Sequence, residues 1–90
     1  MALQGEIILV FASNTRILAA EELLETKELP FILIPVPKEV NPNCGLAISF
    51  AEQNLQEFLQ VLDEADLWPE SSYWRLGDIF SNYPLPREKT

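Results

Sequence analysis

Residues 6–36, EIILVFASNTRILAAEELLETKELPFILIPV, decide the fold, because two apolar runs flank a segment with helical spacing. The runs at residues 6–12 and 31–36 are rich in Ile, Leu and Val, as is typical of buried strands. Between them, residues 16–27 predict a helix whose apolar stripe is formed by Ile17, Ala20 and Leu24. Ser13, just before this helix, is a preferred N-cap residue. The stretch therefore predicts a strand-helix-strand unit.

The second half of the sequence repeats the order after a loop, residues 37–44, that is rich in Pro and Asn. It predicts a strand at 46–50, a helix at 52–66 and a short strand at 73–76. Because connections are short and crossovers right-handed, this order predicts an α+β, ferredoxin-like βαββαβ sandwich. Its four-stranded antiparallel sheet carries two helices on one face. The first and third strands are then central and the other two form the edges.

We expect residues 1–77 to form a single domain and residues 78–90 to form a C-terminal tail. The tail contains several apolar residues, namely Ile79, Phe80, Tyr83 and Leu85. Because two helices cover only one face of such a sheet, we expect the tail to fold back across the open face or to bind a partner.

The composition excludes several kinds of function. The 90 residues include no His and one Cys, Cys44, and 14 acidic against 6 basic residues give a formal charge of −8. A Ser-His-Asp triad, a His-bearing zinc site and an internal disulfide therefore need residues that the chain lacks. The acidic charge is unsuited to nucleic acid. Carboxylates at surface helix spacing and isolated glycines predict neither a metal nor a cofactor.

The targeting features of the sequence predict a cytoplasmic protein. No basic region precedes the first apolar run, and Pro residues interrupt the apolar stretches well short of a membrane span of about 20 residues. A single unpaired Cys suits a reducing compartment.

Cys44 is the candidate functional residue. In the predicted topology it lies at the head of the third strand, close to the start of the first helix, whose residues are Ser13, Asn14, Thr15 and Arg16. Free helical N–H groups, together with Arg16 and Lys38, would lower the pKa of a thiol there. The alternative is that Cys44 is a small buried hydrophobe. Its flanking Asn, Pro and Gly residues favour a surface loop, and both interpretations stay open.

The segment from Pro35 to Gly45, PVPKEVNPNCG, resembles the selenium/sulfur carrier protein-like family of small bacterial proteins. The family pattern also includes an apolar strand that ends in Phe-x-Ser, here Phe11 to Ser13. The resemblance implies that Cys44 holds sulfur or selenium as a persulfide or selenopersulfide and passes it to a partner protein. Gly45 would leave room for that partner. Family members often carry a His at the helix start, where this chain has Asn14 to Arg16.

Two hypotheses follow, and both favour a carrier or binding protein over an enzyme. The first is the thiol carrier, which needs a protein donor or acceptor of sulfur or selenium. The second is a non-catalytic interaction module or small acidic subunit of a larger complex. It would dock through an edge strand, the aromatic residues Trp68 and Trp74, and the C-terminal tail with Phe80 and Tyr83. Free edge strands would also permit a homo-oligomer.

Overall fold

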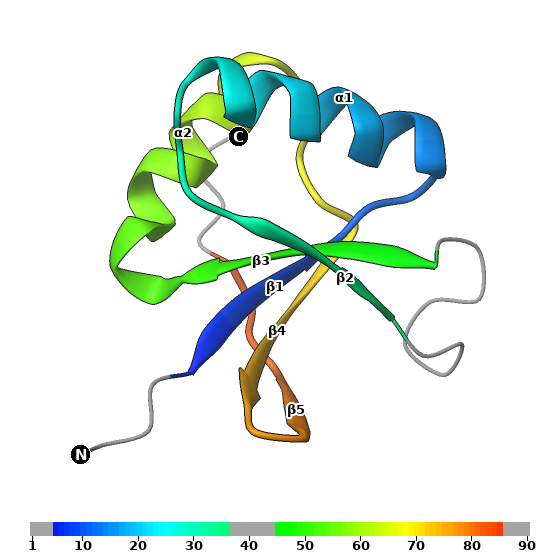
Figure 1. Cartoon of the computed structure of the whole chain (residues 1–90), viewed down its shortest axis with the longest axis vertical. Coiled ribbons are helices and arrows are strands. Elements are labelled where there is room, and N and C mark those ends of the chain that lie inside the picture. Colours follow the sequence, from blue (N-terminus) through cyan, green and yellow to red (C-terminus); the bar gives the residue numbers. More distant parts are fainter. Residues whose placement is uncertain (1–4, 37–44, 86–90) are drawn as a thin grey trace.

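The computed structural model describes residues 5–36 and 45–85. Figure 1 shows one antiparallel sheet with both helices packed on the same face. In chain order the elements are β1 (Glu6–Val10), α1 (Asn14–Thr26), β2 (Ile32–Pro35), β3 (Leu46–Ala51), a 3-10 turn (Glu52–Asn54), α2 (Leu55–Glu64), β4 (Ser71–Leu76) and β5 (Ile79–Asn82). The prediction of an α+β fold with two helices on one face of an antiparallel sheet is confirmed.

The sheet has five strands rather than the four predicted, in the order β2-β3-β1-β4-β5. As predicted, the first and third strands are interior and Pro35 lies in an edge strand. The predicted edge position of the fourth strand is wrong, because β5 pairs with it antiparallel. Residues 79–82, expected to cross the open face as part of a tail, instead extend the sheet. A two-residue turn brings them back, with Leu76 opposite Ile79 and Gly77 at a φ of 64°.

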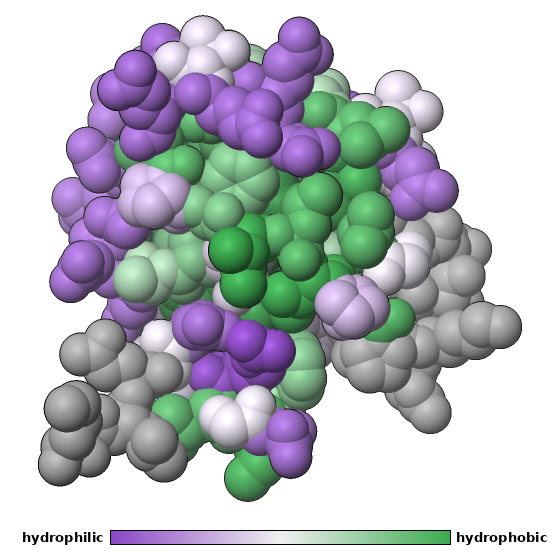
Figure 2. Space-filling model, in the orientation of Figure 1, coloured by the Kyte–Doolittle hydropathy of each residue, from purple (hydrophilic) through white to green (hydrophobic). Residues whose placement is uncertain are grey.

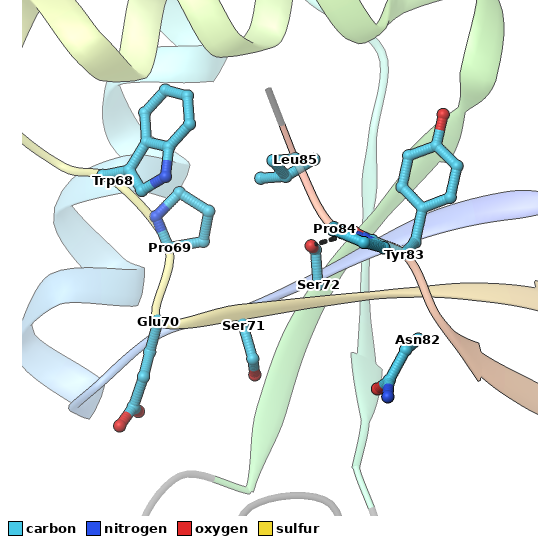
Figure 3. Close-up of a pocket in the computed structure, with 9 residues that line it drawn as sticks. All are labelled: Trp68, Pro69, Glu70, Ser71, Ser72, Asn82, Tyr83, Pro84 and Leu85. Carbon is cyan, nitrogen blue, oxygen red and sulfur yellow. Dashed lines mark hydrogen bonds between the residues drawn. The ribbon is translucent and has the colours of Figure 1, made fainter. Parts of the chain in front are cut away.

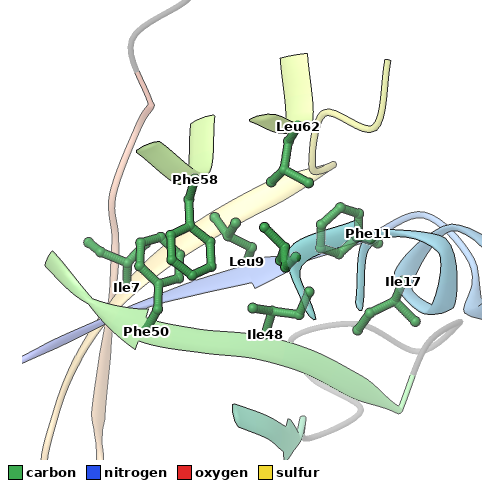
Figure 4. Packing of buried hydrophobic residues seen from close by; sticks show 10 residues of the cluster. Ile7, Leu9, Phe11, Ile17, Ile48, Phe50, Phe58 and Leu62 are labelled. Carbon is green, nitrogen blue, oxygen red and sulfur yellow. The ribbon is translucent and has the colours of Figure 1, made fainter. Parts of the chain in front are cut away.

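The main core fills the space between the sheet and the two helices (Figure 4). The Phe50 ring from β3 stacks on the Phe58 ring from α2, with centroids 3.9 Å apart and planes within 4°. Around this pair lie the other fully or almost fully buried members of the cluster, namely Ile7, Leu9, Phe11, Ile17, Ala20, Leu24, Ile48 and Leu62. They come from alternate positions of β1 and β3 and from one stripe of each helix, as the sequence periods require.

The opposite face of the sheet has a smaller cluster made of strand residues and Val36. Its buried members are Ile8, Val10, Ile34, Val36 and Ala47, with Tyr73 and Phe80 packed against them. On the same face the Ser49 hydroxyl and the Arg75 guanidinium both donate to the Glu6 carboxylate. Within the described residues, neither helix is long and apolar enough to cross a membrane.

Both helices end in the same way. Glu28 follows α1 and Asp66 follows α2, each with a φ of 59° in the left-handed region. The next residue, Leu29 or Leu67, donates its N–H back to a carbonyl in the last turn, that of Leu24 or Leu62 respectively. Leu29 and Leu67 also pack on the main core. These ends therefore follow the Schellman pattern, although neither uses the Gly that usually stands there.

Candidate functional site

The candidate site is the end of the sheet where β1 finishes and β3 begins. The Val36 N–H donates to the Gly45 carbonyl at 3.0 Å, so Gly45 pairs with the residue after β2. In the neighbouring pair of strands, β1 and β3, Val10 lies opposite Ala47. Extending that register by two residues brings Ala12 level with Gly45, and the N-cap of α1 is the next residue. The fold thus brings Gly45 and the start of α1 to the same end of the sheet.

Cys44 and Lys38 lie outside the described residues, so the site is built from what surrounds them in the chain. Gly45 is exposed. Among the described residues that are not its chain neighbours, none has an atom within 4 Å of a Cβ added to Gly45, and the φ of Gly45 is not in the left-handed region. Neither packing nor backbone conformation therefore requires glycine at this position. Within residues 5–36 and 45–85, the residue that directly follows Cys44 faces open space.

The start of α1 supplies N–H groups and positive helix-dipole charge. The Ser13 hydroxyl accepts from the Arg16 N–H at 3.3 Å, which confirms Ser13 as the N-cap. Asn14 and Thr15 are the exposed first residues of the helix. No acidic side chain occupies this first turn, so none opposes the positive end of the helix dipole.

Arg16 has a contact that the sequence did not reveal. Its guanidinium donates to the backbone carbonyl of Asp66, just beyond α2, at 2.7 Å. This bond joins the start of α1 to the end of α2 at the same end of the domain. At least one guanidinium N–H group of Arg16 is therefore occupied by the protein itself.

The four aromatic residues predicted to dock a partner, namely Trp68, Trp74, Phe80 and Tyr83, lie at three different locations on the domain. Trp74 and Tyr83 stack with centroids 5.9 Å apart and pack on the helix side of the sheet. Phe80 contacts Tyr73 edge-on at 6.5 Å on the opposite face. Trp68 and Tyr83 line a groove of about 380 Å³ between the α2–β4 connection and the chain after β5 (Figure 3). The structure therefore gives three of the four an aromatic partner within the chain.

The sequence did not single out Ser72 and Asn82, which line the same groove. The Ser72 hydroxyl donates to the Tyr83 carbonyl, and the Tyr83 N–H donates to the Ser72 carbonyl (Figure 3). These contacts depend on the pairing of β5 with β4, so only recognition of the Gly77-Asp78 hairpin turn could have predicted them. Among the described residues no group of three or more His, Cys, Asp or Glu side chains could hold a metal ion.

Comparison with known proteins gives one family and one relative. The family model described as "Putative Se/S carrier protein-like" matches residues 6–73, from β1 into β4. A protein of Aquifex aeolicus (strain VF5) described as "Putative sulfur carrier protein" is 31% identical over 68 residues, which cover 73% of this chain and 34% of the relative. The match to this chain thus spans about a third of the length of that curated relative. No solved structure matches. The chain belongs to the Se/S carrier protein-like family.

Proposed function

We propose that this protein is a carrier that holds sulfur or selenium on Cys44 as a persulfide or selenopersulfide and passes it to a partner protein. The observation that carries the proposal is the family match, because residues 6–73 include the single Cys of the chain. The A. aeolicus relative is described as a putative sulfur carrier protein.

The proposed chemistry is a thiolate exchange at a sulfane sulfur. The Cys44 thiolate attacks the outer sulfur of a donor persulfide, the donor S–S bond breaks, and the donor leaves as a thiolate. Cys44 then holds that sulfur as a persulfide, with no net oxidation or reduction. In the second step an acceptor thiolate attacks the same outer sulfur and Cys44 leaves. Selenium in place of the outer sulfur follows the same balance.

The surroundings of Gly45 support such a role. The start of α1 lies at the same end of the sheet, and a helix N-terminus without acidic neighbours in its first turn stabilises a nearby anion. The open space beside Gly45 supports the close approach of a second protein. We further propose that the fold is a ferredoxin-like arrangement extended by β5, and that the carrier works in the reducing cytoplasm.

Mass spectrometry of the intact protein tests the proposal. The chain is incubated under anaerobic conditions with a cysteine desulfurase and either cysteine or selenocysteine, from which the desulfurase forms the donor persulfide or selenopersulfide. We expect the mass of one sulfur or selenium atom to be added, and to be absent from the Cys44→Ser variant. No addition to the wild-type chain, or an equal addition to the variant, would overturn the proposal.

The alternative function is a non-catalytic interaction module that docks through the groove lined by Trp68 and Tyr83 and the C-terminal segment, without Phe80, which lies on the opposite face of the sheet. The groove of about 380 Å³ beside Trp68 and Tyr83 supports it. Because β5 is part of the sheet, a point variant is a sharper test than removal of residues 78–90. If this surface docks a partner, Trp68→Ala abolishes copurification of a partner that Cys44→Ser retains.

A further inference from the structure

The outer edge of β2 has no neighbouring strand among the described residues, since β2 pairs only with β3. Backbone groups in an antiparallel pair point alternately toward and away from the partner strand. Val36 bonds to Gly45, so two positions back Ile34 also points toward β3 and Leu33 points away. Pro35 points away as well and has no N–H, which explains why proline is tolerated there. Leu33 therefore presents a backbone donor and acceptor at a free edge.

A groove of about 520 Å³ runs beside this edge, between β2 and α1. Leu29, Phe31 and Leu33 contribute its apolar lining, and Glu21, Glu25 and Glu28 contribute the α1 side. Figure 2 shows the apolar band across the middle of this face, over β2, with hydrophilic side chains above it along α1. Ile32 borders the groove, but its side chain alternates with that of Leu33 and so lies toward the opposite side of the sheet, where it is 56% exposed. The groove is thus apolar at its base and acidic along one wall.

The acidic wall is formed by α1 and the residues just beyond it. Glu21 and Glu25 are four residues apart on one face of α1, and Glu28, two residues past the end of the helix, lines the same groove. None of the three is in an ion pair with another described residue. A segment added to the edge would alternate its side chains between the groove and the opposite side of the sheet.

We propose that the β2 edge binds an extended segment of a partner protein that has Lys or Arg at alternate positions and apolar residues between them. The basic side chains would lie in the groove against the α1 glutamates, and the apolar ones beside Ile32 on the other face. A second copy of this chain fits poorly, because its own β2 is Ile-Leu-Ile-Pro and it would bring three more glutamates to the groove. The proposal does not depend on Cys44.

Fluorescence anisotropy with a labelled acetyl-Val-Lys-Val-Lys-Val-Lys-Val-amide peptide tests the proposal, with the same peptide carrying Glu for Lys as the charge control. We expect the Lys peptide to bind and the Glu peptide not to bind. The triple variant Glu21→Gln, Glu25→Gln, Glu28→Gln should weaken binding about tenfold. Its matched control is Glu57→Gln, Glu64→Gln, Glu70→Gln, which changes the net charge equally at exposed sites away from the groove and should bind as the wild type does.

Amide hydrogen exchange locates the peptide. Bound peptide should slow exchange at the Leu33 N–H and leave β5 unchanged, in both the wild type and Cys44→Ser. The proposal is overturned if the peptide does not bind, or if both triple variants lose affinity equally. It is also overturned if β5 rather than Leu33 gains protection, or if sedimentation shows that a second copy occupies the edge. Loss of persulfide formation with peptide binding intact would count against the carrier function alone.

Discussion

Val36 and Gly45 are joined by a backbone hydrogen bond of 3.0 Å, in which the Val36 N–H is the donor. The bond connects the residue after β2 to the residue before β3. Gly45 directly follows Cys44 in the sequence, and this contact fixes Gly45 at a defined corner of the sheet. The start of α1 is at the same corner, because β1 is the neighbour of β3.

Gly45→Ala should leave the fold intact. The added Cβ meets no atom within 4 Å and the backbone is not left-handed, so we expect the free energy of unfolding to change by less than about 0.5 kcal/mol. Urea denaturation measures this change. If sulfur transfer to an acceptor protein slows while stability is unchanged, Gly45 serves the approach of that protein. A loss of stability well above about 0.5 kcal/mol would contradict the finding that Gly45 has space for a Cβ.

Gly5→Ala should destabilise the protein, because the added Cβ would clash with the Trp74 ring. Trp74 is held by its stack with Tyr83, so the ring must shift. We expect a loss of about 1–2 kcal/mol and a changed near-ultraviolet circular dichroism spectrum. In the Trp74→Leu background the same substitution should cost clearly less, because the clash is removed. Equal costs in both backgrounds would contradict the contact.

Glu28→Gly and Glu25→Gly should change stability in opposite directions. Glu28 has a φ of 59° just beyond α1, where glycine relieves strain, so its replacement should stabilise by about 0.5–1 kcal/mol. Glu25 is inside α1, where glycine costs about 1 kcal/mol. Denaturant unfolding measures the stability of both variants. Destabilisation by Glu28→Gly would contradict the left-handed conformation of Glu28 at the end of α1.

Tyr83 should ionise at higher pH than an ordinary tyrosine. Desolvation by burial raises its pKa above 10.0, and so do the hydrogen bond from its hydroxyl to the Glu52 carboxylate, at 3.2 Å, and the charge of that carboxylate. Its contribution to stability is therefore full below pH 10.0 and is lost as the pH rises through the folded-state pKa. An ultraviolet absorbance titration of the wild type, less that of Tyr83→Phe, isolates this residue. A difference curve centred at or below 10.0 would contradict the environment described for Tyr83.

Much of the fold could be predicted because the buried strands and helices have strong periodic patterns. The central positions of β1 and β3 followed from the order of elements, and Ser13 was predicted as the N-cap from its residue type and place. The edge position of β2 also followed from the order of elements, and Pro35 agrees with it, because its missing N–H costs nothing when it faces away from β3.

The fifth strand was missed because Ile79–Asn82 is short and only Phe80 of its side chains is not exposed. Its signal was the Gly77-Asp78 pair between two runs of strand-forming residues, a two-residue hairpin turn. The contacts of Arg16 with Asp66 and of Gly5 with Trp74 could not be predicted. They join residues far apart in sequence whose distance is set only after the elements pack.

The central claim is that Cys44 both accepts and releases a sulfane sulfur. The most direct measurement loads the chain with isotopically labelled sulfur from a cysteine desulfurase, removes the donor, adds an acceptor thiol and follows the label by mass spectrometry. The carrier function predicts that the wild type gains a single labelled sulfur and passes it to the acceptor, whereas Cys44→Ser gains none. A wild-type chain that takes up no label, or a Cys44→Ser variant that takes up as much, would contradict it.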